Sequence, residues 1–319
     1  MKNQFVKDLT IGTKVNDIFY LINRWQFDKR SGGKFLVLEL ADRSGIIKGK
    51  IWDNVEVLYS ACSPGNFVKV VGDVTEYNDE IQITIADIKA VPEKEVSLKD
   101  FIASSRFDLN EMYQELIGYI EMVTDADYQR LLKSAFANQD LVTKFKLAPA
   151  SAGIHHAYIG GLLEHTLFML RLARQVPVVY PELDYSLVIT GIIFHDIGKI
   201  REYQYDKVIS HTDEGYLIGH IVIGYEIVKA EIEKLKDFPE EKKQLLLHII
   251  LSHHGIKEYG SPITPKFAEA YFVHNLDNLD ARMMMFREAV EKSADVKWSD
   301  YHRFLETRIF IKNYKEERQ

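Results

Sequence analysis

The sequence predicts two domains of different class, a small β-barrel at the N-terminus followed by an all-α helical bundle. The chain has 319 residues, which exceeds what one hydrophobic core usually serves. Apolar residues alternate with period two from Val15 to Ala90, and helical spacing takes over beyond a linker near residues 91–105. All eleven histidines lie at or beyond His155, so the two parts also differ in chemistry.

The N-terminal part is predicted to form five short strands separated by turn residues. These strands are Val15–Phe27, Phe35–Ala41, Ile46–Trp52, Phe67–Tyr77 and Ile81–Ala90. Only the gap from Asp53 to Gly65 is long enough for a short helix. Five strands with one helix between the third and fourth is the layout of an OB-fold barrel, which often binds single-stranded nucleic acid on strands two and three. We expect this domain to cover residues 1–92.

The rest of the chain is expected to be helical. Its prolines fall between periodic runs and its glycines are few, as in a bundle with short connections. We expect residues 93–149 to form a linker and connecting helices, residues 150–312 to form the bundle, and residues 313–319 to be a frayed tail.

Composition narrows the class of protein. With 46% hydrophobic and 27% charged residues, the chain is expected to pack a core rather than to be disordered or fibrous. The longest apolar stretches fall short of the roughly 18 residues that a membrane span needs, and the N-terminus lacks a secretory pattern, so we expect a cytoplasmic protein. Residues 1–92 are charge-balanced and the net charge of −7 lies in the remainder, which disfavours duplex binding by bulk charge. The single cysteine, Cys62, cannot build a thiolate metal site alone.

Histidines and aspartates on apolar helical runs form a candidate metal site. His195 and Asp196 are adjacent inside the apolar run 189–200, and Lys199 follows one turn later. Burying this pair would require a charge partner such as a divalent cation; the alternative is a helix end where both side chains face water. Five imidazoles and two carboxylates in similar settings suit Mn, Fe, Zn or Mg. They are His165, His195, Asp196, His220, His253, His254 and Asp277.

At these positions the chain resembles the HD-domain phosphohydrolase superfamily, whose motif is an early His, a His-Asp doublet and a late Asp. The barrel before the bundle, the segment His155-His156-Ala157-Tyr158 and the segment Gly260-Ser261-Pro262 make it similar to the YhaM family of bacterial 3'-to-5' exoribonucleases. The resemblance implies hydrolysis of single-stranded RNA, with single-stranded DNA as a further candidate, to nucleoside 5'-monophosphates. It also implies a homo-oligomer and two divalent ions bridged by Asp196, Mn²⁺ first, with Fe, Co, Zn or Mg as alternatives.

The resemblance also suggests roles around the metals. Lys199 is expected to stabilise charge that develops on the phosphate, or else to be a helix C-terminal cation. Substrate contacts are expected from His155, His156, Tyr158 and Ser261, although the two histidines could equally be a solvated loop pair. Glu164 and His274 are candidates to orient ligands, or else a surface carboxylate and a core histidine. Asp277 is preferred to Asp280 as the ligand because the late Asp of the family pattern aligns there.

The barrel supplies a candidate nucleic-acid surface. Alternation places Lys48, Lys50 and Trp52 on one face of the third strand, and Phe35 begins the second strand. Aromatic side chains stack on bases while cations pair with phosphates, although such aromatics can also belong to the rim of the core. Two other functions remain as alternatives. One is a nucleotide or cyclic-dinucleotide phosphohydrolase, disfavoured because Ile256 rather than a Gly-Tyr-Pro signature follows Gly255, and the other is a non-catalytic DNA-binding protein.

Overall fold

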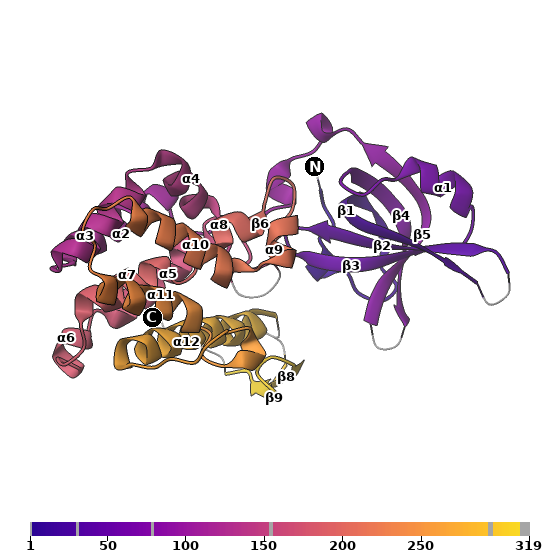
Figure 1. Cartoon of the computed structure of the whole chain (residues 1–319). Helices are drawn as coiled ribbons and strands as arrows, with labels where there is room; N and C mark the ends of the chain where they lie inside the picture. The colour runs from indigo at the N-terminus through magenta and orange to yellow at the C-terminus, as the bar shows by residue number, and fades with distance from the viewer. Residues whose placement is uncertain (1, 30–31, 78–79, 153–155, 293–295, 313–319) are drawn as a thin grey trace. The chain divides into compact units, whose positions relative to one another are not determined.

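The computed structural model describes residues 2–29, 32–77, 80–152, 156–292 and 296–312. The chain divides into two compact units, one of Met1–Ala103 with Tyr205–Ile209 and the other of Ser104–Gln204 with Ser210–Gln319. Strands dominate the first unit and helices dominate the second (Figure 1). The predicted fold class, a barrel followed by a helical region, is confirmed.

The first unit is a closed barrel with the strand order β1-β2-β3-β5-β4. All neighbours are antiparallel except β3 and β5, and β1 pairs with β4 to close the barrel. Each predicted strand is present, and the helix α1 (Val55–Ala61) lies between β3 and β4 as expected. The strands are β1 (Lys14–Asp28), β2 (Lys34–Asp42), β3 (Gly45–Ile51), β4 (Phe67–Tyr77) and β5 (Glu80–Val91). Short 3-10 helices are η1 (Val6–Asp8), η2 (Glu93–Glu95) and η3 (Leu98–Asp100).

Alternation along the strands builds the barrel core. Leu36, Leu38 and Leu40 of β2 are fully buried, whereas the residues between them are only partly covered. The register shifts in β1 between Leu21 and Asn23, and such a bulge bends a long strand. The bend lets one strand pair with β2 along one part and with β4 along another, which closes the sheet.

The second unit is built around α7 (Tyr185–Phe194). Every residue from Ser186 to Phe194 is buried, and α7 contacts α5, α11 and α12. A helix that is apolar on all sides has to be surrounded by others. The other helices are α2 (Leu109–Met122), α3 (Ala126–Phe136), α4 (Gln139–Leu147), α5 (Gly161–Ala173), α6 (Val176–Val179), α8 (Lys199–Glu202), α9 (Asp213–Leu217), α10 (His220–Glu233), α11 (Glu240–Ser252), η4 (Lys257–Tyr259) and α12 (Ala268–Lys292).

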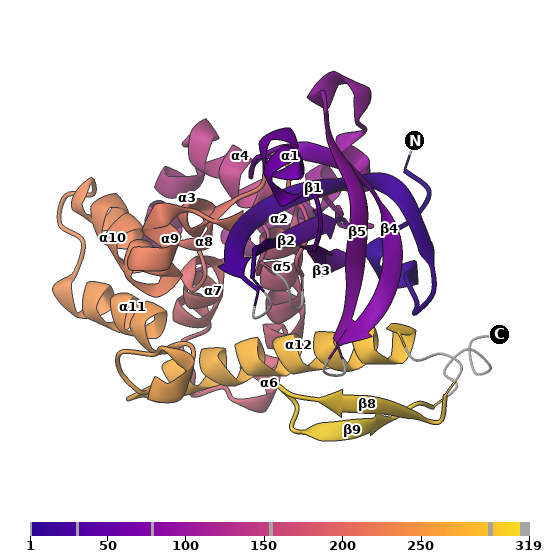
Figure 2. The same cartoon turned by 90° about the vertical axis from the view of Figure 1, so that its right-hand side faces the viewer.

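Two short hairpins interrupt the bundle and were not predicted from the sequence. One joins β6 (Tyr203–Gln204) to β7 (Ser210–His211), and the other joins β8 (Trp298–His302) to β9 (Thr307–Phe310). Strands this short carry too few residues for period-two alternation to be recognised. The second hairpin lies along α12 in both views (Figure 2). Among the described helices, none combines the length and apolarity that a membrane crossing requires.

Candidate metal centre

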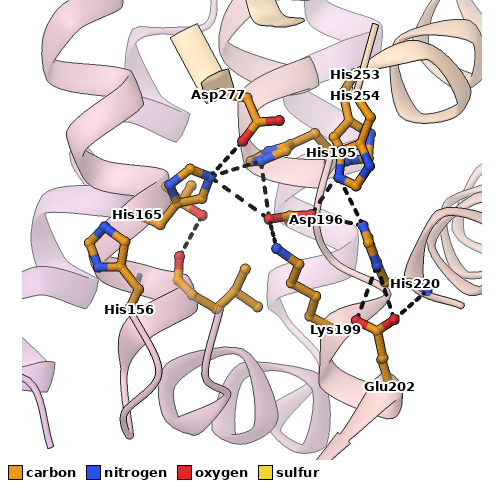
Figure 3. Close-up of polar contacts among 12 residues, drawn as sticks. His156, His165, His195, Asp196, Lys199, Glu202, His220, His253, His254 and Asp277 are labelled. Atoms are coloured by element: carbon orange, nitrogen blue, oxygen red, sulfur yellow. Dashed lines mark hydrogen bonds and ion pairs between the residues drawn. The ribbon is translucent and has the colours of Figure 1, made fainter. Parts of the chain in front are cut away.

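The predicted ligands lie on, or directly after, five different helices, and Figure 3 shows their side chains gathered together. His195 and Asp196 directly follow α7, and α5 contributes His165. His220 is the first residue of α10. The pair His253 and His254 follows the last residue of α11, and Asp277 lies on α12. The structure therefore brings all seven predicted side chains together from positions more than a hundred residues apart.

Asp196 lies between two groups of ligands, and each of its oxygens faces one group. Its Oδ2 is 3.4 Å from His195 Nε2 and 3.8 Å from His165 Nε2. Its Oδ1 is 3.5 Å from the Nε2 atoms of both His220 and His253. We call His165, His195 and Asp277 the first cluster, and Asp196, His220, His253 and His254 the second cluster. Within each cluster the ligand atoms lie within 4.8 Å of one another.

Backbone carbonyls orient one histidine of each cluster. His195 Nδ1 lies 2.7 Å from the carbonyl oxygen of Ile192, and His253 Nδ1 lies 2.7 Å from that of Ile250. A carbonyl can only accept, so Nδ1 donates its proton and the Nε2 lone pair is left to face Asp196. The ends of α7 and α11 thus present both imidazoles in the tautomer that a metal ligand needs.

The donor set fits a divalent metal. Among the residues that the structure describes, Asp196 Oδ1 and His253 Nε2 are buried without a hydrogen-bond partner. Leaving such atoms unsatisfied is costly, and a cation between them would remove that cost. Imidazole nitrogens and carboxylate oxygens without thiolates suit ions such as Mn, Fe, Zn or Mg.

Electrostatics keep the carboxylates ionised. Burial raises the pKa of Asp196, but the charge of Lys199 outweighs burial and holds that pKa well below its usual value. Burial likewise raises the pKa of Asp277, and its hydrogen bond with His165 reverses the shift. Burial lowers the pKa of His253 to about 3, which keeps this imidazole neutral. Deprotonated carboxylates and neutral imidazoles such as His253 are the forms that bind metal. Burial lowers the pKa of His165, but its hydrogen bonds with Asp277 and Asp280 outweigh burial and raise that pKa to about 10, so a cation would have to displace a proton from this imidazole.

Lys199 is the cation of the site. It begins the short helix α8, is 8% exposed, and places its Nζ 2.5 Å from Asp196 Oδ2. Burial lowers the pKa of Lys199, but the charge of Asp196 outweighs burial and raises it above the usual value. A permanently charged ammonium therefore lies beside the carboxylate that separates the two clusters.

The predicted substrate residues are placed differently from what was expected. His155 lies outside the described residues. His156 is fully buried, with Nε2 3.0 Å from Asp280 Oδ2 and Nδ1 2.7 Å from the hydroxyl of Tyr158. The hydroxyl of Ser261 is buried between the carbonyl oxygens of Leu251 and Ile263. Substrate contact by His156, Tyr158 and Ser261 stays a prediction, and such contact would compete with the protein groups that these side chains bind. The alternative of a solvated loop pair is wrong for His156, which is buried.

The proposed orienting residues separate into two cases. His274 Nδ1 lies 2.7 Å from the carbonyl oxygen of His253, so it supports the turn that carries both ligand histidines. Gly255, with φ of +76°, makes room for it, since a Cβ there would lie 2.1 Å from the His274 ring. Glu164 is buried and accepts a hydrogen bond from Ser105 Oγ at 2.6 Å, so it is not the surface carboxylate of the alternative prediction.

Two carboxylates lie behind the clusters, of which sequence reasoning missed Glu202 and weighed Asp280 only as a metal ligand. Glu202 lies 3.1 Å from His220 Nδ1, and Asp280 lies 2.7 Å from His165 Nδ1. Asp280 is one turn after Asp277 on α12, so both aspartates face His165, and the spacing was a usable signal. Glu202 follows Lys199 by three residues, but only the fold reveals that α10 begins beside it.

The barrel carries an exposed row of stacked aromatic rings. Phe35 stacks on Phe27 and Trp52 with ring centroids 5.5 Å and 4.8 Å away. Lys50 Nζ lies 5.7 Å from the Trp52 ring and 4.3 Å from the Tyr77 ring. Trp52 is 37% and Phe27 49% exposed, so the row is a surface and not part of the core. We call Phe27, Phe35, Trp52 and Tyr77 the barrel aromatic surface.

The charge of Lys48, the other predicted lysine of the barrel, is balanced by a neighbouring carboxylate. Lys48 forms an exposed ion pair with Glu80, with 2.7 Å between Nζ and Oε2. Lys50 instead points its ammonium at two aromatic rings. Of the two lysines, Lys50 is therefore the one that combines a cation with the barrel aromatic surface.

Comparisons with known proteins match both units. A family model described as HD domain matches residues 162–282, and one described as OB-fold nucleic acid binding domain matches residues 20–91. The chain is 34% identical over 303 residues to the 3'-5' exoribonuclease YhaM of Bacillus subtilis (strain 168), covering 95% of this chain and 96% of that protein. It is 35% identical over 305 residues to the YhaM protein of Bacillus licheniformis and 36% identical over 308 residues to that of Bacillus pumilus, with the same coverage of both chains. Both clusters fall inside the residues that the HD-domain model matches, and the barrel aromatic surface falls inside those that the OB-fold model matches.

Proposed function

Because the chain belongs to the YhaM family of 3'-5' exoribonucleases, we propose that it is a metal-dependent 3'-5' exoribonuclease that hydrolyses single-stranded RNA to nucleoside 5'-monophosphates. The observation that carries the proposal is the placement of two ligand clusters on opposite oxygens of one carboxylate, Asp196. A carboxylate that contacts two ions would hold them close together, as in the two-metal sites that hydrolyse phosphodiesters.

The proposal assigns the metal ligands by cluster. His165, His195 and Asp277 would hold one ion, His220, His253 and His254 would hold the other, and Asp196 would contact both. When bound, two divalent ions supply Lewis-acid chemistry, which lowers the pKa of water and neutralises charge on the phosphodiester. Mn²⁺ is the proposed ion, with Fe, Co, Zn or Mg as alternatives that the same donors accept.

Other side chains of this chain bind and orient. Lys199 holds Asp196 through its ammonium and adds a fixed positive charge where negative charge develops on the phosphate. The barrel aromatic surface and Lys50 would stack bases and attract phosphates of the single strand. Residues 1–92 would thus be the binding domain, residues 93–149 the connection, and residues 150–312 the hydrolase domain.

The proposal extends to substrate range and assembly. Single-stranded DNA is a second substrate, because stacking on aromatic rings requires no 2'-hydroxyl. We also propose a homo-oligomer and a cytoplasmic location, where single-stranded RNA is available.

The test uses 5'-labelled single-stranded RNA with the Mn²⁺-loaded protein. We expect a ladder that shortens by one nucleotide at a time, with nucleoside 5'-monophosphate as the released product. A circular RNA of the same sequence should resist, because it has no 3' end. Cleavage of the circle at the same rate as the linear strand would show that the protein is an endonuclease. Release of nucleoside 3'-monophosphates would show that it cuts the other P–O bond of the phosphodiester, which would contradict the proposed product.

A further inference from the structure

Two buried carboxylates lie behind the metal clusters without belonging to the ligand set. Glu202 is 5% exposed and Asp280 is 6% exposed. Each one contacts the Nδ1 atom of a histidine whose Nε2 atom faces a cluster. Glu202 does so with His220 at 3.1 Å, and Asp280 with His165 at 2.7 Å.

Glu202 fixes both the ring and the backbone of His220. Its Oε1 is 3.1 Å from the backbone N and 3.1 Å from Nδ1 of His220, the first residue of α10 (Figure 3). An ionised carboxylate only accepts hydrogen bonds, so Nδ1 carries the proton and Nε2 is left to face Asp196. Gly215 lets α9 lie close against Glu202, because a Cβ there would lie 2.3 Å from the backbone carbonyl oxygen of Glu202 and 3.0 Å from its Cγ.

Asp280 contacts two histidines, the candidate ligand His165 and the buried His156. Its Oδ2 lies 2.7 Å from His165 Nδ1 and 3.0 Å from His156 Nε2, and the other nitrogen of His156 lies 2.7 Å from the Tyr158 hydroxyl. His156 has a φ of +54°, a left-handed conformation that non-glycine residues rarely adopt. Strained backbone persists where surrounding contacts require it, and here the strain places a fully buried ring against Asp280.

The two clusters share one pattern. In each, one histidine is oriented by a backbone carbonyl of its own helix, as His195 and His253 are, and another is oriented by a carboxylate. A carboxylate carries charge as well as direction, so it makes the imidazole a stronger donor to a metal than a carbonyl does. In each cluster, therefore, one histidine is oriented by its own buried carboxylate.

We propose that Glu202 and Asp280 are positioning residues for different metal ions. Glu202 acts through His220 on the ion of the second cluster, and Asp280 acts through His165 on the ion of the first. The inference rests on the metal centre of the proposed function and not on the identity of the substrate.

Titration of the metal-free full chain with Mn²⁺ tests this by calorimetry, with bound Mn²⁺ counted after gel filtration. Wild type should bind two ions per chain. Glu202→Gln and Asp280→Asn should each weaken one ion by about 10- to 100-fold and leave the other unchanged. Glu214→Gln, on neighbouring α9 where the carboxylate pairs with Arg201, is the matched control and should bind both ions as wild type does.

Combined variants show which ion each carboxylate serves. Added to His220→Ala, Glu202→Gln should cause no further loss of affinity, because its path through His220 is already removed. Added to His165→Ala, it should weaken the second-cluster ion by the same factor as in wild type. Asp280→Asn should show the reverse dependence. If Glu202→Gln weakens binding equally in both backgrounds, Glu202 does not act through His220 and the assignment is wrong.

Folding is checked by thermal denaturation of each metal-free variant. Should Glu202→Gln fail to fold, Glu202→Asp keeps the charge on a shorter side chain and should give a smaller loss confined to one ion. Two ions bound with wild-type affinity in all these variants would overturn the inference even if RNA is hydrolysed. Selective loss of one ion would support it even if the chain does not hydrolyse RNA, so the two proposals fail separately.

Discussion

The barrel aromatic surface and the metal centre place functional side chains in opposite environments. Phe27 and Trp52 are 49% and 37% exposed, and each stacks its ring on Phe35. His195 and Asp196 are buried, the candidate ligands around them are buried or partly buried, and direct polar contacts join these side chains. Each base stacked on an exposed aromatic ring contributes a modest amount of binding free energy, whereas buried ligands that share one carboxylate act as a unit. We therefore expect graded effects on binding from the barrel and large effects on chemistry from the centre.

The largest effect is expected at the shared carboxylate. Asp196→Asn should lower RNA hydrolysis by more than about 10³-fold, because removing even one preorganised electrostatic group typically costs 10²- to 10³-fold and Asp196 faces both clusters. The rate of nucleoside monophosphate release and the Mn²⁺ content measure this. The amide leaves the buried ammonium of Lys199 unpaired, so Asp196→Asn with Lys199→Met is the matched control for stability. Wild-type activity in Asp196→Asn would contradict the expectation that substitutions in the metal centre affect chemistry far more than those in the barrel.

Next comes the lysine that binds this carboxylate. Lys199→Met keeps much of the side-chain volume and removes the charge, so kcat should fall by about 10²- to 10³-fold while KM for RNA changes little. Steady-state kinetics with RNA of fixed length separate the two constants. An unchanged kcat would show that Lys199 only stabilises Asp196 and takes no part in the reaction.

The barrel should affect binding and leave chemistry intact. Stacking is worth about 1–3 kcal/mol per base, so Phe35→Ala with Trp52→Ala should raise KM for long RNA by about 10- to 100-fold. Hydrolysis of a dinucleotide should be unchanged, since it is too short to reach beyond the centre. Lys50→Ala should weaken binding more than Lys48→Ala, because Lys48 is already paired with Glu80. If KM for long RNA stays at the wild-type value, the barrel aromatic surface serves another purpose.

The smallest effect is expected at the exposed start of α3. Asp125 caps this helix by accepting hydrogen bonds from the N–H groups of Asp127 and Tyr128, and it also pairs with Lys242. Asp125→Ala should lower the free energy of unfolding by about 1 kcal/mol at pH 7, whereas Asp125→Asn should lose less because asparagine also caps. Equal losses would assign the effect to the ion pair.

The same cap gives a pH dependence. Burial raises the pKa of Asp125, but its hydrogen bonds with Lys242 and the backbone reverse this and lower it. A depressed folded-state pKa means that the carboxylate stabilises the fold above its unfolded pKa of about 3.9 and loses that contribution as the pH falls through the lower folded value. The stability difference between wild type and Asp125→Ala should therefore shrink in acid, as measured by chemical denaturation at a series of pH values.

The sequence by itself determined the class of both units and the identity of the candidate ligands. Alternation predicted all five barrel strands because one face of each strand is buried, as Leu36, Leu38 and Leu40 show. The seven candidate ligands could be singled out because imidazoles and carboxylates on apolar helical runs are costly to bury without partners. The residues next to a position in the chain show whether it lies on a periodic apolar face and so whether it is buried.

Only the tertiary structure decided which polar atoms face which. Nothing local in the sequence shows that α10 begins beside Glu202, that His156 is buried against Asp280, or that the Ser261 hydroxyl binds backbone carbonyls. The division of the candidate ligands between the two oxygens of Asp196 likewise depends on how α5, α10, α11 and α12 pack near the C-terminal end of α7. Hydrogen bonds and metal sites require alignment to within a few tenths of an ångström between distant segments, and the packing of the whole core fixes that alignment.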